Sequence, residues 1–196
     1  MYARGGKRAL DLLAAALLLA ALLPLMALVA LAVRLALGRP VLFRQVRAGR
    51  DGAPFILLKF RTLRPGPGED AARMTRLGRV LRAFALDELP QLINVLRGEM
   101  SLVGPRPLPL AYLPRYSPRQ RLRLSVRPGL AGLAQAAGRN AVPWEARLDL
   151  DARYAETPPR LARDLALLAR CALLAATGRG AAAAGHATMP EFRPDG

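Results

Sequence analysis

The chain has 196 residues, with 30 lysine and arginine side chains against 14 aspartate and glutamate side chains, which gives a formal net charge of +16. This length suits one compact domain with appendages, and the charge favours an anionic partner such as a phosphorylated substrate or an anionic membrane surface. The single cysteine, Cys171, excludes an intrachain disulfide and a cysteine-based zinc site, and the single histidine, His186, follows an Ala/Gly-rich stretch that does not favour a Ser-His-Asp or Cys-His arrangement. Enzymatic chemistry would therefore rest on carboxylates, arginines and a metal ion.

An uncharged run covers residues 12–33, long enough for a helix to cross the hydrocarbon core of a membrane and too long for the core of a secretion signal. Pro24 near its middle favours a kink. Basic residues flank the run on both sides, and such residues prefer the cytoplasmic face and anionic headgroups of membrane lipid. We therefore favour a re-entrant membrane helix within residues 1–38 over a helix that crosses the membrane once.

Residues 39–177 have the pattern of a cytosolic domain. Two β-rich segments, 40–49 and 54–63, surround a turn, and a loop at 64–70 separates them from a basic helical stretch at 73–84. A helix is expected to follow Asp87 and to end at Gly98, and a turn-rich stretch covers 125–140. Further helices are predicted at 113–124, 145–154 and 159–176.

The expected fold is of the α/β class, mostly helical with short strands. The helix at 159–176 mixes apolar positions with arginines, so it fits either an interfacial amphipathic helix on the membrane or an ordinary core helix. Residues 178–196, with their Ala/Gly-rich beginning, are expected to form a disordered tail.

Two adjacent carboxylates, Asp87 and Glu88, stand out because they lie in an arginine-rich stretch. Asp87 alone would suit the N-cap of the following helix, with Pro90 in the first turn, and would contribute about 1 kcal/mol there. A cap needs only one acid, however, and arginine forks bind phosphate oxygens through two parallel hydrogen bonds. The pair fits a cap, charge compensation or a catalytic pair in a phosphate site. The nearby arginines are Arg76, Arg79, Arg82, Arg97 and Arg106.

Several blocks of the chain resemble one known family. The stretch LDELPQLINVLRGEMSLVGPRP, which contains the acid pair, closely resembles the signature of bacterial sugar transferases, the monotopic polyprenyl-phosphate phosphoglycosyl transferases. Asp151 and Tyr154 fit the later D-x-x-Y of that family. The other matching blocks, in the family's order, are KRALDLL, GRPVLFRQVRAGRDGAPFILLKFRTL, TRLGRVLRAFALDELPQ and RPGLAGLAQAAGRN.

The resemblance implies transfer of a sugar 1-phosphate from a UDP-sugar to undecaprenyl phosphate, with release of UMP, at the cytoplasmic face of the bacterial inner membrane. This is the first membrane step of exopolysaccharide, O-antigen or glycoconjugate assembly. The resemblance also implies magnesium (Mg²⁺), with Asp87 as the nucleophile that forms a phospho-enzyme and Glu88 supporting the metal or the geometry. Carboxylates suit both tasks, since they act as nucleophiles in phosphoryl chemistry and hold Mg²⁺ together with substrate phosphates.

The resemblance also carries over a set of basic residues as candidate substrate contacts. Arg82 is the candidate for the lipid phosphate and Arg106 for the nucleotide diphosphate. For each, the alternative is a solvated surface charge. Asp164 is a candidate metal ligand or structural acid. The complete predicted substrate-binding set is Arg82, Arg106, Lys59, Arg61, Arg127 and Arg139.

The chain departs from the family pattern at Leu23, Leu63, Ala85, Leu133 and Ala137. Leu23 replaces a serine that often precedes the membrane proline, and the changes at 133 and 137 leave the transferred sugar open. Because none of these positions belongs to the acid pair, we still expect activity.

Two other classes of protein remain as alternatives. A catalytically silent, membrane-anchored scaffold of a glycan assembly complex would have no need for an intact acid pair. A nucleic-acid-binding protein would suit the charge, but aromatic residues make up only 5% of the chain and it contains no nucleic-acid-binding motif. We therefore expect no nucleic acid as a partner. The sequence leaves a homodimer open.

Overall fold

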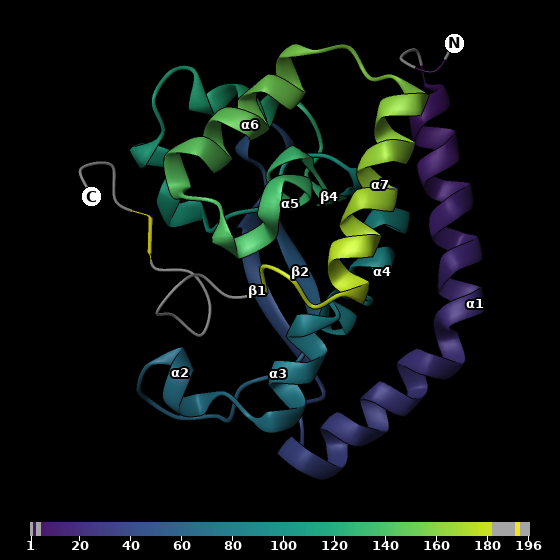
Figure 1. The fold of residues 1–196 in the computed structure, drawn as a ribbon, viewed down its shortest axis with the longest axis vertical. Helices are drawn as coiled ribbons and strands as arrows, with labels where there is room; N and C mark the ends of the chain where they lie inside the picture. Colours follow the sequence, from purple (N-terminus) through teal and green to yellow (C-terminus); the bar gives the residue numbers. More distant parts are fainter. Residues whose placement is uncertain (1, 3–4, 182–190, 193–196) are drawn as a thin grey trace.

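The computed structural model describes residue 2, residues 5–181 and residues 191–192 of the chain. The fold is mostly helical with short strands, as predicted (Figure 1). In chain order the elements are α1 (Gly6–Leu37), β1 (Leu42–Ala48), β2 (Pro54–Phe60), α2 (Asp70–Arg73), α3 (Arg76–Ala83), α4 (Gln91–Leu96), β3 (Ser101–Val103), β4 (Gly129–Ala131), α5 (Leu133–Gly138), α6 (Trp144–Glu156) and α7 (Leu161–Ala176).

Helix α1 contains the whole of the predicted apolar run. Within the described part of the chain it is the one helix long and apolar enough to cross a membrane, and its most apolar window is only 17% buried. Pro24 lies inside it, and the helix changes direction about half-way along its length (Figure 1). These properties fit a membrane anchor. The leucines exposed on α1 are Leu10, Leu13, Leu17, Leu18, Leu23, Leu25, Leu28, Leu31 and Leu35.

Hydrophobic contacts hold both halves of α1 against the rest of the chain. In the first half, Ala15 is fully buried in a core cluster that includes Val95 of α4. In the second half, Val33 is fully buried in a separate cluster with Phe60 of β2 and Leu81 of α3. Each large aliphatic side chain buried in this way contributes about 1.5–3 kcal/mol. The helix is therefore integrated into the fold along its length.

Polar contacts also hold both halves of α1. Near its start, the Asp11 carboxylate accepts a hydrogen bond of 2.6 Å from the Ser101 hydroxyl of β3. At its end, the Arg61 guanidinium donates to the carbonyls of Leu37 and Gly38, the latter at 2.8 Å. The last carbonyls of a helix lack partners within the helix, so Arg61 satisfies groups that would otherwise require water. Both ends of α1 therefore meet the same domain.

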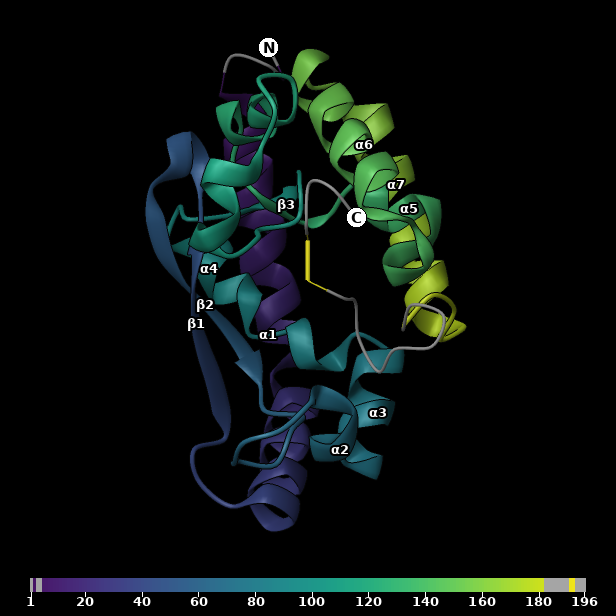
Figure 2. The same ribbon diagram turned by 90° about the vertical axis from the view of Figure 1, so that its left-hand side faces the viewer.

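Strands β1 and β2 form an antiparallel hairpin in which Leu42 pairs with Phe60 and Ala48 with Pro54, as the two β-rich segments predict. Side chains on successive residues of a strand point to opposite faces. Phe55 and Leu57 of β2 pack in the core cluster that contains Ala15 of α1, and Phe60 packs in the cluster that contains Val33. Figure 2 shows the hairpin on one side of the molecule and helices α5, α6 and α7 on the other.

Strands β3 and β4 form a short parallel pair that the sequence did not predict. They align Ser101 with Gly129 and Val103 with Ala131. The backbones approach very closely, since a Cβ added at Gly129 would lie 2.1 Å from the amide nitrogen of Gly104. The glycines that suggested a turn-rich stretch at 125–140 therefore also permit close backbone contact.

The prediction of one helix over 113–124 is wrong. Two separate 3-10 segments, Leu110–Arg115 and Gln120–Ser125, occupy this part of the chain. Pro114 lies inside the first segment and Pro118 between the two. Proline lacks the amide hydrogen that an α-helix needs and clashes with the preceding turn, which breaks the helix here.

The expected disordered tail at 178–196 lies partly outside the described residues. Where described, it contacts the domain. The carbonyl of Gly180 accepts from the Asn140 amide at 2.9 Å, and the carbonyl of Ala181 accepts from the Asn140 side chain at 2.7 Å. Phe192 is 2% exposed. These residues differ from the expectation because specific hydrogen bonds and a buried ring hold them.

Asp164 of α7 makes structural contacts, and no cluster of three metal-ligating side chains forms around it among the described residues. It is 2% exposed, and its Oδ2 accepts from the Tyr2 hydroxyl at 2.6 Å and from Lys7 Nζ at 3.0 Å. Its Oδ1 accepts from the Tyr154 hydroxyl at 3.2 Å. These contacts join α7 and α6 to the start of α1.

We predict that Asp164→Ala lowers the free energy of unfolding by about 3 kcal/mol, because it removes the buried acceptor of Tyr2, Lys7 and Tyr154 and leaves Lys7 only its longer contact with Asp11. Denaturant unfolding of the purified protein in detergent, followed by circular dichroism, measures the change. Asp149→Ala is the matched control, since Asp149 pairs with Arg119 in an exposed salt bridge. A loss for Asp164→Ala no larger than that of the control would contradict the structural assignment.

Candidate active site

A cavity of about 500 Å³ opens beside the acid pair. Its walls come from segments far apart in the sequence, including the β1–β2 hairpin, the loop after β2, the 3-10 turn Leu86–Glu88, the segment after β3, and α6. Every predicted site residue except Arg127 lines it. The fold thus gathers most of the predicted set at one place.

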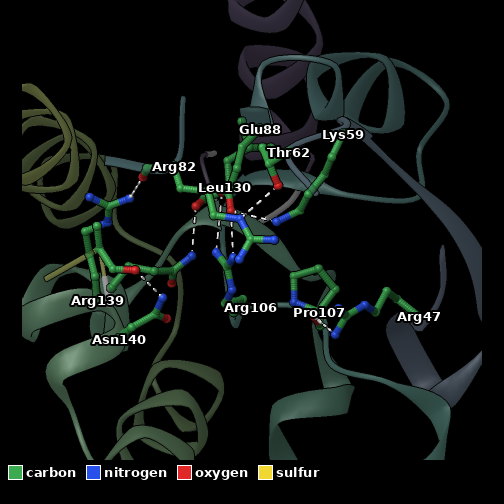
Figure 3. A network of polar contacts seen from close by, with 12 residues as sticks. Arg47, Lys59, Thr62, Arg82, Glu88, Arg106, Pro107, Leu130, Arg139 and Asn140 are labelled. Carbon is green, nitrogen blue, oxygen red and sulfur yellow. Dashed lines mark hydrogen bonds and ion pairs between the residues drawn. The ribbon is translucent and has the colours of Figure 1, made fainter. Parts of the chain in front are cut away.

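Glu88 is the acid of the pair that is fully engaged. Its Oε1 contacts Lys59 Nζ at 2.8 Å and Arg106 Nη2 at 2.6 Å (Figure 3). Burial alone would raise the pKa of Glu88, but Arg106 and Lys59 outweigh burial and hold that pKa well below its usual range. Glu88 is therefore a fixed negative charge that joins strand β2 to the segment after β3.

Asp87 is the free acid of the pair. It is 6% exposed and lines the cavity, yet its carboxylate accepts no hydrogen bond within the described part of the chain. Burial raises its pKa, Lys59 opposes that rise, and the neighbouring Glu88 charge adds to it. A carboxylate without hydrogen bonds is less stabilised as an anion and is free to react.

Asp87 does not cap the following helix. Helix α4 begins at Gln91, its N-cap residue is Pro90, and the cap carries no side-chain hydrogen bond. Asp87 lies instead in the 3-10 turn Leu86–Glu88. The capping interpretation of Asp87 is therefore wrong, because the turn carries its carboxylate toward the cavity rather than toward the amides of the helix.

A strained residue begins this 3-10 turn. Ala85 has a φ of 55°, in the left-handed region that side chains other than glycine rarely adopt. Such a conformation costs on the order of 1–3 kcal/mol and persists where the surrounding structure enforces it. Ala85 also lines the cavity. The left-handed backbone at Ala85 changes the direction of the chain just before the turn that contains the acid pair.

Arg82 projects from α3 toward the acid pair. Its Nε donates to the Thr62 hydroxyl at 2.9 Å, and its Nη1 lies 4.0 Å from Asp70. Burial lowers the pKa of Arg82, and the charge of Asp87 opposes this. Arg82 keeps its charge at neutral pH and places it on the cavity wall.

A buried ion pair between Arg123 and Asp151 holds the backbone of Arg106 in place. Arg123 and Asp151 are 3% and 1% exposed, and Arg123 Nη2 lies 2.7 Å from Asp151 Oδ2. The same Nη2 donates to the Arg106 carbonyl at 2.5 Å, and Nη1 donates to the Tyr116 hydroxyl at 3.0 Å. The Asp of the D-x-x-Y motif therefore positions Arg106 through Arg123.

Three of the predicted substrate-binding arginines donate to backbone carbonyls. Arg61 caps the end of α1, and Arg139 donates to the carbonyls of Ala83 and Arg82, both at 2.8 Å. Both still line the cavity. Arg127 lies outside its lining, with Nε donating to Gly98 beyond the end of α4 at 3.0 Å. The prediction that these three bind substrate stays a prediction.

Two cavity arginines were missed by the sequence analysis. Arg47 and Arg147 contact no carboxylate within the described residues, and the Nε of each is buried without a hydrogen-bond partner there. Burial lowers the pKa of both to about 10, so both remain charged at neutral pH. Arg47 lies in the block GRPVLFRQVRAGRDGAPFILLKFRTL, and the resemblance of that block to the family could have indicated Arg47 as a site residue. No sequence signal distinguishes Arg147 from other arginines.

An aromatic wall faces the same cavity. Tyr112 and Trp144 both line it, and their ring centroids lie 5.8 Å apart in an edge-to-face arrangement. The Arg147 guanidinium lies 5.1 Å from the centroid of the Trp144 ring, within the range of a cation–π contact. The cavity therefore combines a strongly cationic region with an aromatic surface.

The acid pair fits Mg²⁺ only in company with other oxygen donors. The described residues contain no cluster of three acidic, histidine or cysteine side chains that could hold a metal. Asp87 offers a free carboxylate, and Glu88 offers Oε2, whose contact with Arg106 Nη1 is long at 3.4 Å. Mg²⁺ is commonly bound by one or two carboxylates plus substrate phosphates, so this donor set is sufficient if a phosphorylated substrate contributes.

Fold and site together define a protein with a helix that fits a membrane anchor and a cationic cavity that contains a buried carboxylate. Comparison with known families is consistent with that class. The sequence model described as bacterial sugar transferase matches residues 2–177. The chain belongs to the bacterial sugar transferase family.

Individual relatives are similar over most of the chain. An uncharacterised sugar transferase, EpsL, of Bacillus subtilis is 47% identical over 156 residues, 76% of this chain and 77% of that protein. The UDP-glucose:undecaprenyl-phosphate glucose-1-phosphate transferase of Caulobacter vibrioides is 52% identical over 145 residues, 67% of this chain and 54% of that protein. The exopolysaccharide production protein ExoY of Sinorhizobium fredii is 37% identical over 173 residues, 76% of each chain. The chain spans about half the length of the Caulobacter enzyme.

We predict that the Asp87 carboxyl titrates above the ordinary aspartate value of 3.8, because burial disfavours its charged form. Lys59→Met removes the cation that most opposes this shift and is expected to raise the pKa further, whereas Lys59→Arg keeps the charge. Carbon-13 NMR titration of aspartate-labelled protein measures both, and Asp87→Asn identifies the signal. A wild-type midpoint at or below 3.8 would show that the carboxylate is not a buried, unpaired one.

Proposed function

We propose that the chain transfers a sugar 1-phosphate from a UDP-sugar to undecaprenyl phosphate, forming undecaprenyl-diphosphate-sugar and UMP. The observation that carries this proposal is the contrast within the acid pair. Glu88 is held by Lys59 and Arg106, whereas Asp87 is buried in a cationic cavity and accepts no hydrogen bond from the residues that the structure describes. The names of the relatives in Caulobacter vibrioides and Escherichia coli, both UDP-glucose:undecaprenyl-phosphate glucose-1-phosphate transferases, support the reaction class.

The proposed reaction has two displacements at phosphorus. First, an Asp87 carboxylate oxygen attacks the β-phosphorus of the UDP-sugar, and the bond from that phosphorus to the bridging oxygen breaks. UMP leaves with the bonding electrons, and the sugar phosphate remains on Asp87 as an acyl phosphate. Next, an oxygen of undecaprenyl phosphate attacks the same phosphorus, and the Asp87 carboxylate leaves unchanged. Dividing one displacement into two in this way is the usual advantage of a covalent intermediate.

The cavity arginines would offset the repulsion between a carboxylate nucleophile and an anionic diphosphate. Arg82 and Arg106 lie beside the acid pair, and Arg106 is held in place from behind by Arg123. Arg47 and Arg147 contribute further charge without a carboxylate to neutralise it. Preorganised cations of this kind stabilise charge that develops on a transferring phosphoryl group.

We include Mg²⁺ in this proposal, held by Asp87 and Glu88 together with the donor diphosphate. When bound there, the ion would neutralise charge on the diphosphate. Glu88 Oε1 is paired with Lys59, so Oε2 would be the oxygen available to the ion, and the protein residues carry the remaining steps.

We also propose that α1 enters and leaves the membrane on the cytoplasmic side. Its start and its end contact the same domain, through Asp11 and Arg61. A helix that crossed the bilayer would carry one end away from that domain. UDP-sugars are soluble and undecaprenyl phosphate is held in lipid, so a site beside such an anchor would let them meet. The product would prime an exopolysaccharide, O-antigen or glycoconjugate.

We predict that Asp87→Asn lowers UMP release by at least about a thousandfold, as the loss of a covalent nucleophile does elsewhere. Purified protein in detergent is given undecaprenyl phosphate, Mg²⁺ and a panel of UDP-sugars. The wild type is expected to retain label from a UDP-sugar labelled at the β-phosphate, and the variant is not. Chelation by EDTA should stop release, and added Mg²⁺ should restore it.

Asp149→Asn serves as the control for this assay, because Asp149 is an exposed acid on α6 and should retain wild-type release. Normal turnover by Asp87→Asn would refute Asp87 as the nucleophile. A wild-type protein that releases no UMP from any UDP-sugar of the panel would instead favour the silent scaffold.

The membrane arrangement predicts that both ends of α1 are reached from the cytoplasm. Ala9→Cys and Arg39→Cys are introduced separately into a Cys171→Ala background, since both positions are exposed. An impermeant maleimide added to intact cells should label neither, and both should react after lysis. Labelling of one position alone in intact cells would refute the re-entrant arrangement and support a single crossing.

A further inference from the structure

The chain's own C-terminal segment reaches the aromatic wall of the cavity. Phe192 is 2% exposed and sits in a cage of three rings. Its ring centroid lies 5.7 Å from that of Tyr112, 5.6 Å from that of Trp144 and 6.2 Å from that of Tyr116. This residue lies beyond positions 2–177, which match the sugar transferase family. The contact therefore belongs to this chain rather than to the matched family region.

Directional hydrogen bonds accompany the ring contacts. The Phe192 amide donates to the Tyr112 hydroxyl at 3.1 Å, and Arg115 Nη1 donates to the Phe192 carbonyl at 2.5 Å. The same Arg115 nitrogen lies 2.7 Å from Glu191 Oε1. Backbone and side chain are thus both fixed, which distinguishes this docking from loose hydrophobic contact. Residues 191–192 form the short yellow segment in Figure 1.

The cage is also part of the site. Tyr112 and Trp144 line the cavity that contains Asp87. On its other side, Tyr116 accepts the hydrogen bond from Arg123, the residue that also donates to the Arg106 carbonyl. Phe192 therefore touches both the aromatic wall and the support of Arg106.

A ring in this cage restricts its neighbours. Edge-to-face and tilted aromatic pairs each contribute about 0.5–1.5 kcal/mol beyond their buried area, and they favour particular ring orientations. Without the Phe192 ring, Tyr112 and Trp144 each lose an aromatic contact. The surface that the cavity presents to a ligand would then no longer be held in one arrangement.

We propose that Phe192 is a positioning residue for the donor: by filling the cage of Tyr112, Tyr116 and Trp144, it fixes the wall against which the nucleoside-sugar part of a UDP-sugar binds. This inference rests on the proposed function. The donor's diphosphate must reach Asp87, so the remainder of the donor extends along the cavity. Flat rings in its path offer it a stacking surface.

The test uses the fact that Trp144 is the only tryptophan in the chain. Its fluorescence in the full-length protein in detergent reports both the cage and the binding of UDP, without any turnover. Phe192→Ala is expected to raise the Kd for UDP by about fivefold to tenfold, the loss of one or two aromatic contacts. The KM for the UDP-sugar should rise by a similar factor, with kcat changed little.

Two further variants separate positioning from folding. Phe192→Tyr keeps a ring in the cage and is expected to retain near wild-type Kd and KM. Asp164→Ala breaks buried contacts between α7, α6 and the start of α1, outside the cavity lining, and is expected to lower stability without changing either constant. If Phe192→Ala lowers only stability or kcat, or binds UDP as tightly as the wild type or more tightly, the proposal is overturned.

The outcome also separates this inference from the proposed function. A wild-type protein that releases no UMP from any UDP-sugar refutes the transferase proposal. The UDP titration monitored by Trp144 still decides whether Phe192 shapes a nucleotide-binding wall. A transferase whose Phe192→Ala variant keeps the wild-type Kd and KM refutes the inference alone.

Discussion

The ion pairs of Glu88 with Lys59 and Arg106 are the interaction on which the site depends. Three charges are removed from bulk water together, and each would be costly to bury without the others. Because Lys59 belongs to β2 and Arg106 to the segment after β3, one carboxylate fixes the spacing of three parts of the chain. Asp87 precedes Glu88, so anchoring Glu88 also fixes where the unpaired carboxylate lies. Glu88 is thus the structural acid of the pair, and Asp87 is left available for the proposed reaction.

The arginines around this centre are held largely by hydrogen bonds to backbone carbonyls. Arg123 binds the Arg106 carbonyl while Asp151 neutralises Arg123 in the interior. Arg61 and Arg139 donate to carbonyls at the ends of α1 and α3. A guanidinium that bonds a neutral carbonyl keeps its charge, so such contacts stabilise helix ends without reducing the positive potential of the cavity.

The sequence predicted the elements whose signal is local. The apolar run gave α1, alternation and a turn gave the β1–β2 hairpin, and helical periodicity gave α3, α6 and α7. Strands β3 and β4 were not predicted, because a strand of three residues is too short to show an alternating pattern of apolar and polar side chains. Their pairing also depends on close glycine contacts between distant segments. Family resemblance indicated Asp87 and Glu88. It could not distinguish their states, since burial and hydrogen bonding are properties of the folded chain.

The same reasoning explains why Arg47 and Arg147 were missed. Only two of the 30 basic residues are lysines, so an individual arginine carries little information in this sequence. What sets these two apart is burial without a carboxylate, which appears only in three dimensions. A nucleophilic carboxylate and a diphosphate repel one another, and a surplus of fixed cations around both is the simplest way to bring them together. The basic composition by itself indicates only an anionic partner. The structure places part of that positive charge at this cavity, where the proposed reaction would use it.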